Sequence, residues 1–294
     1  MVTWASLAWT SAAILLVLLI AYAQLPIGEG SYPSFALAVV VVLGVLGAIG
    51  WWFLHSELAA REVDSRALPD RPEFYDYGLL NLPRHGAELG GKNITDIAYT
   101  VFDTETTGLR PSDGDEIISI GAIGVRDGNV ASDLLFDVLI DPGRPIPKAS
   151  IRIHGISDDM VTGQPAIGPR IKEFHAFAGD TVLVAHSAPF DMTFLKLKEA
   201  ETGVSFDHLV LDTLLISVFL DRDAKDQSFE AIARRHGVQI EGRHSAIGDA
   251  VATAEIFAAM LKRLPARGVT TLDQLIRACE EMTAVRKLQE QYGA

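Results

Sequence analysis

Two long apolar runs near the N-terminus place the strongest constraint on how this chain can fold. Trp4 to Ala23 is a run of 20 residues without a charged side chain, and Ser34 to Leu54 is a run of 21. Each is long enough to cross the hydrocarbon core of a bilayer as a helix. The alternative is a pair of buried core helices, but uncharged runs of this length are rare in soluble folds. We therefore predict a transmembrane hairpin that uses the lipid bilayer as a partner.

The distribution of basic residues predicts the orientation of this hairpin. Residues 1–56 contain no Lys or Arg, whereas Arg61, Arg66 and Arg71 follow the second run. Basic residues collect on the cytoplasmic side of a membrane. A cleaved signal peptide fits poorly, because no basic segment precedes the first run. We expect a multi-pass protein of the cell (inner) membrane, with the chain after residue 56 in the cytoplasm.

Charge and cysteine content limit what the rest of the chain can bind. The chain has a net charge of −13, and Glu29 is the only charged residue before Glu57, so the remainder is strongly acidic. An acidic surface argues against broad electrostatic capture of duplex nucleic acid. The single cysteine, Cys279, excludes an intramolecular disulfide framework and suits a reducing compartment.

Composition and periodicity divide the chain into parts of different character. We predict an anchor at residues 1–56 (spans about 4–23 and 34–54), a juxtamembrane linker at 57–94, a folded domain at 95–264 and a C-terminal amphipathic helix at 265–294. The linker mixes charges with prolines and glycines, and the domain is long enough to bury a sizeable core.

The pattern inside the domain predicts an α/β fold. Apolar runs separated by turn residues predict a three-stranded meander at residues 97–102, 116–126 and 130–140. Further strands are predicted at 181–185 and 209–212, among helices at 167–178, 190–200, 213–220, 228–236, 245–264 and 271–292. Strands followed by alternating strands and helices indicate a mixed sheet with helices packed against it.

Two acids follow the first predicted strand within the sequence VFDTETTGL. Side chains two positions apart on a strand share a face, so Asp103 and Glu105 would point the same way if the strand continues through them. Their repulsion would raise one pKa unless a cation neutralises them, and divalent cations with oxygen ligands suit such a pair. Taken alone, the pair is weak evidence for a metal site, and solvated loop acids are the better interpretation.

Two further acids and a histidine strengthen the case for a metal site. Asp191 lies in the sequence HSAPFD, in the first turn of a helix that follows a buried strand. In the sequence HSAIGDA, His244 precedes Asp249 by five positions, a spacing that places the two side chains on different faces if both are helical. We therefore expect His244 in the loop before the helix, where it could act as a general base without ligating the metal.

These three motifs resemble the exonuclease motifs of the DEDDh family, which includes the proofreading subunit of bacterial replicative polymerases, RNase T and oligoribonuclease. Their order and spacing agree with the family across about residues 97–264. A tyrosine four positions before the last acid would indicate the sister subgroup, and Ser245 stands there instead. The resemblance implies a ribonuclease H-like fold with a five-stranded mixed sheet flanked by helices.

The resemblance also implies which residues act. It assigns two divalent cations, Mg²⁺ or Mn²⁺, to Asp103, Glu105, Asp191 and Asp249, and it assigns the general base to His244. Contacts with the terminal nucleotide are implied for Thr106, Thr107, Gly108, Leu109, His154 and Phe190. Two of these have structural alternatives: His154 could brace a turn, and Phe190 could pack in the core.

The resulting hypothesis is a membrane-anchored, metal-dependent 3′–5′ exonuclease. It would release nucleoside monophosphates from single-stranded 3′ ends of DNA or RNA by two-metal-ion hydrolysis. Two other functions are compatible with the motifs: a catalytically inactive exonuclease fold that serves as a binding module, and a proofreading partner of a DNA polymerase. The sequence indicates no specific protein partner and does not show whether the substrate is DNA or RNA.

Overall fold

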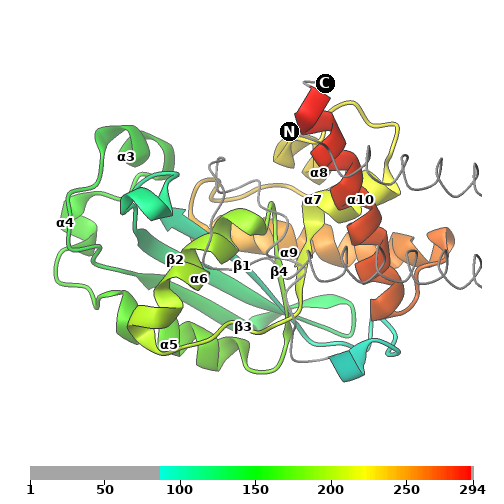
Figure 1. The fold of residues 1–294 in the computed structure, drawn as a ribbon, viewed down its shortest axis with the longest axis horizontal. Helices are drawn as coiled ribbons and strands as arrows, with labels where there is room; N and C mark the ends of the chain where they lie inside the picture. Colours follow the sequence, from blue (N-terminus) through cyan, green and yellow to red (C-terminus); the bar gives the residue numbers. More distant parts are fainter. Residues whose placement is uncertain (1–86, 293–294) are drawn as a thin grey trace, which may run out of the picture. The chain divides into compact units, whose positions relative to one another are not determined.

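The computed structural model describes residues 87–292, which form a five-stranded mixed sheet flanked by helices (Figure 1). The strand order is β3-β2-β1-β4-β5. The antiparallel meander consists of β1 (Tyr99–Thr106), β2 (Ile117–Arg126) and β3 (Asn129–Leu139). Two short strands, β4 (Val182–Ala185) and β5 (Val210–Asp212), continue the sheet parallel to β1. This confirms the predicted fold class.

The predicted transmembrane spans and most of the predicted linker lie outside the described residues. Between residues 87 and 292, no helix combines the length and the apolar character that crossing a membrane requires. The topology and localisation inferred from the two apolar runs therefore remain predictions.

Most helices begin and end near their predicted positions. They are α3 (Lys148–His154), α4 (Asp158–Val161), α5 (Ile167–Ala178), α6 (Pro189–Thr202), α7 (Thr213–Leu220), α8 (Phe229–His236), α9 (Ala246–Arg263) and α10 (Leu272–Tyr292), with short 3₁₀ turns at η3 (Ala87–Leu89), η4 (Pro111–Asp113) and η5 (Leu264–Arg267). The sequence pattern did not predict α3 or α4. These helices are short and α3 buries none of its side chains, so neither shows an apolar period.

Alternate residues of β1 face opposite helical layers. The ring of Tyr99 packs edge-on against Phe257 of α9, with centroids 4.8 Å apart. The ring of Phe102 packs against Phe174 of α5 at 5.3 Å. Odd-numbered side chains of β1 therefore point toward α9, and even-numbered side chains point toward the layer that contains α5 and α6.

A glycine allows α9 to approach the sheet closely. Gly121 of β2 lies opposite Asp103 of β1 in the antiparallel ladder. A Cβ atom at Gly121 would overlap the backbone of Ala246 and Ile247, in the first turn of α9. The absence of a side chain at this position therefore brings the start of α9 against the face of the sheet toward which Asp103 points.

The end of the predicted linker and the start of α10 are joined. Ile94 is fully buried, and its N–H donates to the Thr270 carbonyl at 3.0 Å. The N–H of Leu272 donates in turn to the Lys92 carbonyl at 3.2 Å. Because Leu272 and Leu275 are also buried, the first turns of α10 pack against the domain as part of its core.

Candidate active site

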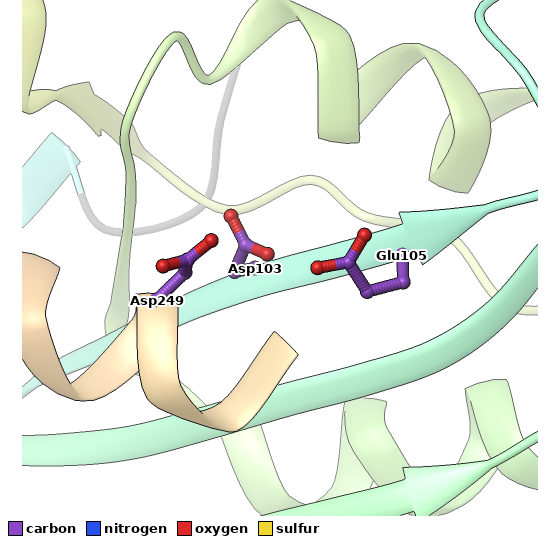
Figure 2. A group of neighbouring side chains, drawn as sticks. All are labelled: Asp103, Glu105 and Asp249. Carbon is purple, nitrogen blue, oxygen red and sulfur yellow. The ribbon is translucent and has the colours of Figure 1, made fainter. Parts of the chain in front are cut away.

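Three carboxylates converge where α9 meets the sheet. β1 continues through Asp103 and Glu105, so both side chains point toward α9. Asp249 comes from the first turn of α9, whose N-cap is Ser245. One oxygen atom from each of the three carboxylates lies within 4.8 Å of the other two, and Figure 2 shows the three groups facing a common space. The pairing of Asp103 with Glu105 depends on β1 being longer than the predicted strand.

Asp191 joins this group from the opposite side of the sheet. It is buried in the first turn of α6, and its Oδ1 accepts hydrogen bonds from the N–H of Thr104 at 3.0 Å and from its hydroxyl at 2.6 Å. β4 pairs with β1 only from Tyr99 to Val101. Because β4 ends before Thr104, this N–H has no partner in the sheet and can hold Asp191 beside Asp103.

The four carboxylates are in electrostatic conflict. Burial raises the pKa of Asp103 well above its usual range, and the charges of Asp191, Glu105 and Asp249 raise it further. Burial is also the main reason why the pKa of Glu105 and that of Asp191 rise to about 7. The hydrogen bonds from Thr104 oppose the shift at Asp191. This arrangement favours a positive charge between the acids.

The hydrogen bonding of Asp249 is consistent with a divalent cation bound by these carboxylates. Its Oδ1 is buried and, among the described residues, makes no hydrogen bond. Its Oδ2 accepts from the backbone N–H of His244 at 3.2 Å and pairs with the guanidinium of Arg243. A buried carboxylate oxygen without a partner is costly, and hard cations such as Mg²⁺, Mn²⁺ and Ca²⁺ prefer carboxylate oxygens.

His244 lies in the loop before α9, as the spacing of the motif predicts. Its backbone is in the left-handed region with φ +62°, which is uncommon for residues other than glycine. This conformation directs its N–H to Asp249 while the residue stays exposed. An exposed imidazole whose backbone is bonded to one of the acids has the freedom that a general base requires.

His154 belongs to the same neighbourhood. It is the last residue of α3, and its Nδ1 accepts the N–H of Ile156 at 3.0 Å, so it braces the turn after the helix. The pKa of His154 lies below its usual value, mainly because the ring is partly buried. The charge of His244 lowers this pKa further, and the interaction with the Thr106 backbone opposes the shift. The Nε2 of His154 is buried and makes no hydrogen bond within the described part of the chain. His154 therefore makes a structural contact through Nδ1, and its ring lies close to the Thr106 backbone and to His244.

The turn after β1 is braced from within. The Thr106 hydroxyl donates to the Gly108 carbonyl at 2.6 Å. Thr107 is fully buried, and its hydroxyl donates to Asp115 at 3.1 Å and accepts the N–H of Glu116 at 3.0 Å. Among residues 106–109, Leu109 is the most exposed, at 61%, and its side chain is available to a ligand.

Phe190 packs against the core, as one of its two predicted roles requires. Its ring meets Phe194 edge-on with centroids 5.1 Å apart, and the residue is partly buried. The adjacent Asp191 is thereby fixed at the start of α6.

Two contributors to the site were not assigned their roles from the sequence. Thr104 stands between Asp103 and Glu105 in the sequence, so its side chain points to the other face of β1, where its hydroxyl bonds Asp191. This alternation along the strand was the available signal for its role. Arg243 pairs with both Asp249 and Glu230, a role that its charge alone does not indicate. Its position directly before His244 was the available signal.

Comparison with known proteins identifies the family. The model of the exonuclease family matches residues 100–257, more than half of the chain. The chain belongs to the exonuclease family. The matched range contains the four acids, His154 and His244, so the family assignment covers the whole candidate site.

Sequence relatives of this exonuclease-family chain carry names from DNA replication. It is 45% identical over 219 residues to a DNA polymerase III subunit epsilon-like protein of Rhodobacter capsulatus, covering 74% of this chain and 30% of that protein. It is 36% identical over 189 residues to the PolC-type DNA polymerase III of Clostridium perfringens, covering 63% of this chain and 13% of the other. The chain thus spans less than a third of the length of either relative.

A solved structure confirms the fold. Exonuclease I of E. coli, crystallised with a dA16 oligonucleotide, superposes with a TM-score of 0.51 over 58% of this chain and 42% of its own. The two sequences are 16% identical, so the likeness concerns the fold alone. The ribonuclease H-like exonuclease fold implied by the motifs is therefore present in residues 87–292.

Proposed function

We propose that this chain is a metal-dependent 3′–5′ exonuclease of the DEDDh subgroup that releases nucleoside monophosphates from single-stranded 3′ ends. The observation that carries the proposal is the convergence of Asp103, Glu105 and Asp249 within 4.8 Å, together with a buried oxygen of Asp249 that makes no hydrogen bond to any described residue. A pure binding module has no use for buried acids in mutual repulsion, whereas phosphodiester hydrolysis by divalent cations requires them.

Each residue of the site has a role in this reaction. Asp103, Glu105, Asp191 and Asp249 would hold two Mg²⁺ or Mn²⁺ ions, and Thr104 would keep Asp191 beside Asp103. Bound cations make water a stronger acid and neutralise phosphate charge. His244 accepts the proton of the attacking water at its imidazole.

The turn after β1 and His154 would receive the end of the strand. Gly108 and Leu109 follow the acids directly and are partly or fully exposed, so they offer backbone and apolar surface to the terminal nucleotide. His154, whose buried Nε2 makes no hydrogen bond within the described residues, would lie beside them. Thr106, Thr107 and Phe190 would support this surface from inside.

The test is a panel of 5′-labelled DNA and RNA oligonucleotides, single and double stranded, incubated with the purified full chain and Mg²⁺ or Mn²⁺. We expect stepwise shortening from the 3′ end, release of mononucleotides and complete loss of activity in EDTA. Asp103→Asn should abolish the activity in protein of unchanged melting temperature. Equal turnover by this variant, or no turnover by the wild type on any substrate, would overturn the proposal in favour of contamination or a binding module.

The names of the relatives favour DNA ends and a DNA polymerase as partner. Because the chain spans 30% of the epsilon-like relative and 13% of the PolC-type polymerase, this is a second proposal of narrower scope. It predicts faster digestion of DNA than of RNA and a preference for a mismatched over a paired primer terminus. Equal rates on both termini would contradict a proofreading role.

We also propose that the exonuclease domain is anchored on the cytoplasmic face of the cell (inner) membrane. The support is the pair of uncharged runs and the basic residues that follow them. A C-terminal tag should resist protease in intact spheroplasts and be cleaved after lysis. Cleavage in intact spheroplasts, or a tagged chain recovered in the soluble fraction, would contradict this topology.

A further inference from the structure

Arg243 links the acid cluster to a separate helix. Its Nη1 pairs with Oδ2 of Asp249, and its Nε donates to Oε1 of Glu230 at 3.0 Å. Its guanidinium lies over the ring of Phe229, 4.9 Å from the centroid. Glu230 and Phe229 begin α8, so the side chain of Arg243 bridges α8 to the first turn of α9.

The two oxygens of Asp249 are used differently. Oδ2 accepts from Arg243 and from the N–H of His244, whereas Oδ1 is buried and makes no hydrogen bond within the described residues. Two donors on one oxygen restrict rotation of the carboxylate. The other oxygen belongs to a carboxylate that has an oxygen atom within 4.8 Å of oxygens of Asp103 and Glu105.

We propose that Arg243 is a positioning residue that orients Asp249 for metal binding, with Glu230 as its support. This inference rests on the proposed function, because it takes the acid cluster to be a cation site. Outer groups that hydrogen-bond a ligating carboxylate fix its direction, and their loss typically lowers metal affinity about 10–100-fold.

The opposite role, a built-in counter-ion that competes with the metal, fits the contacts less well. A competitor would leave neither oxygen of Asp249 open to a cation, whereas Arg243 and His244 share Oδ2, and Oδ1 makes no hydrogen bond within the described residues. Glu230 offsets the charge of Arg243 through the bond to Nε, which reduces its repulsion toward a cation. We therefore take the restraint on Asp249 to outweigh the remaining repulsion, and the sign of the change in Mn²⁺ affinity tests this.

The experiment measures Mn²⁺ binding to the full chain by calorimetry, in detergent and without nucleic acid. Arg243→Gln should weaken Mn²⁺ binding about 10–100-fold. Arg243→Lys should recover only part of the loss, because an ammonium cannot reproduce the planar fork that bonds two carboxylates at once. Arg234→Gln is the matched control, since it removes the same charge from an exposed position on α8 and should leave the affinity unchanged.

A double-mutant cycle separates positioning from a general effect of charge. Glu230→Gln should weaken Mn²⁺ binding in the wild-type background and have no further effect in the Arg243→Gln background, because Glu230 acts through Arg243. Tighter binding by Arg243→Gln would establish the counter-ion role and overturn the inference, as would additive effects in the cycle. Glu230 is 51% exposed, so Glu230→Gln tests the inference even if Arg243→Gln folds poorly.

Mn²⁺ binding by the wild type distinguishes failure of the proposed function from failure of the positioning role. Absence of Mn²⁺ binding by the wild type would refute the cation site and with it the proposed function. Normal binding by the wild type together with unchanged binding by Arg243→Gln would refute the positioning role alone.

Discussion

At the scale of single residues, His244 supports the most direct kinetic prediction. His244→Gln should lower kcat about 10²–10⁴-fold, the usual contribution of a general base. Mn²⁺ affinity should be preserved, because the group of side chains that could hold a metal, as far as the structure is described, consists of acids. Single-turnover hydrolysis at saturating Mn²⁺ measures the first effect, and calorimetry measures the second.

The matched control for this prediction is His175→Gln. His175 lies on α5, in the layer on the opposite face of the sheet, where its Nε2 contacts the Ser205 carbonyl at 3.1 Å. This variant loses the same ring and should keep kcat within about twofold. A loss below about tenfold for His244→Gln would assign the proton transfer to another group.

At the scale of elements, the contact between α9 and β2 is the most sensitive point of the fold. Gly121→Ala should destabilise the protein by about 1–3 kcal/mol, because the new methyl group overlaps the α9 backbone. The same displacement should move Asp249 away from Asp103 and weaken Mn²⁺ binding. Urea unfolding and calorimetry report the two effects.

Gly168→Ala is the comparison at this scale. Gly168 lies in α5 with no atom within 4 Å of a Cβ at that position, so this change should be neutral or slightly stabilising. Equal stability of Gly121→Ala and Gly168→Ala would show that the packing of α9 on the sheet tolerates an extra methyl group.

The ion pairs of Asp221, which link α7, α8 and α9, should make the stability of the protein depend on pH. The carboxylate accepts from Arg263 of α9 at 3.0 Å and pairs with Nε of Arg235 of α8 at 3.4 Å. The hydrogen bonds from Arg263 are the main reason why the pKa of Asp221 lies below its usual range. A folded-state pKa below the unfolded value stabilises the protein above the unfolded pKa, and this contribution is lost as the pH falls through the folded pKa.

Asp221→Asn should therefore lower the free energy of unfolding by about 1–2 kcal/mol at pH 7, a modest value because Arg263 is 41% exposed. The difference from the wild type should shrink as the pH falls below about 4, the unfolded pKa of Asp. Urea unfolding from pH 3 to 7 measures it. A difference that grows toward low pH would have the wrong sign.

At the scale of the whole molecule, the net charge of −13 predicts weak dependence of substrate binding on salt. An acidic protein has few side chains that replace counter-ions on nucleic acid. Two or three phosphate contacts to a single strand give a slope of about −2 when the logarithm of the binding constant is plotted against the logarithm of the salt concentration. KM at constant Mg²⁺ should therefore change less than about twentyfold between about 50 and 200 mM KCl. A change of about 10³-fold would indicate 6 or more phosphate contacts.

Local features of the chain were predictable at the scale of elements. The limits of α5 and α7, the cap of α8 by Ser228 and its termination at Gly237 follow from apolar spacing and from residues that satisfy free backbone groups. The extension of β1 through Glu105 was a condition of the metal-site hypothesis, and pairing with β2 fulfils it. Where a segment buries little, as in α3, the same reasoning had no signal.

The sequence by itself determined the order of the strands and of the helices other than α3 and α4, and it contains the exonuclease motifs with their four acids. Each of these features depends on neighbours within a few positions. Tertiary structure decided how the acids meet. Thr104 holds Asp191 across 87 positions of sequence because β4 ends early, and Gly121 admits the start of α9 with Asp249. These contacts depend on register and close packing between distant segments, which local patterns do not encode. The ion pairs of Arg243 with Glu230 and Asp249 likewise depend on the approach of α8 to α9.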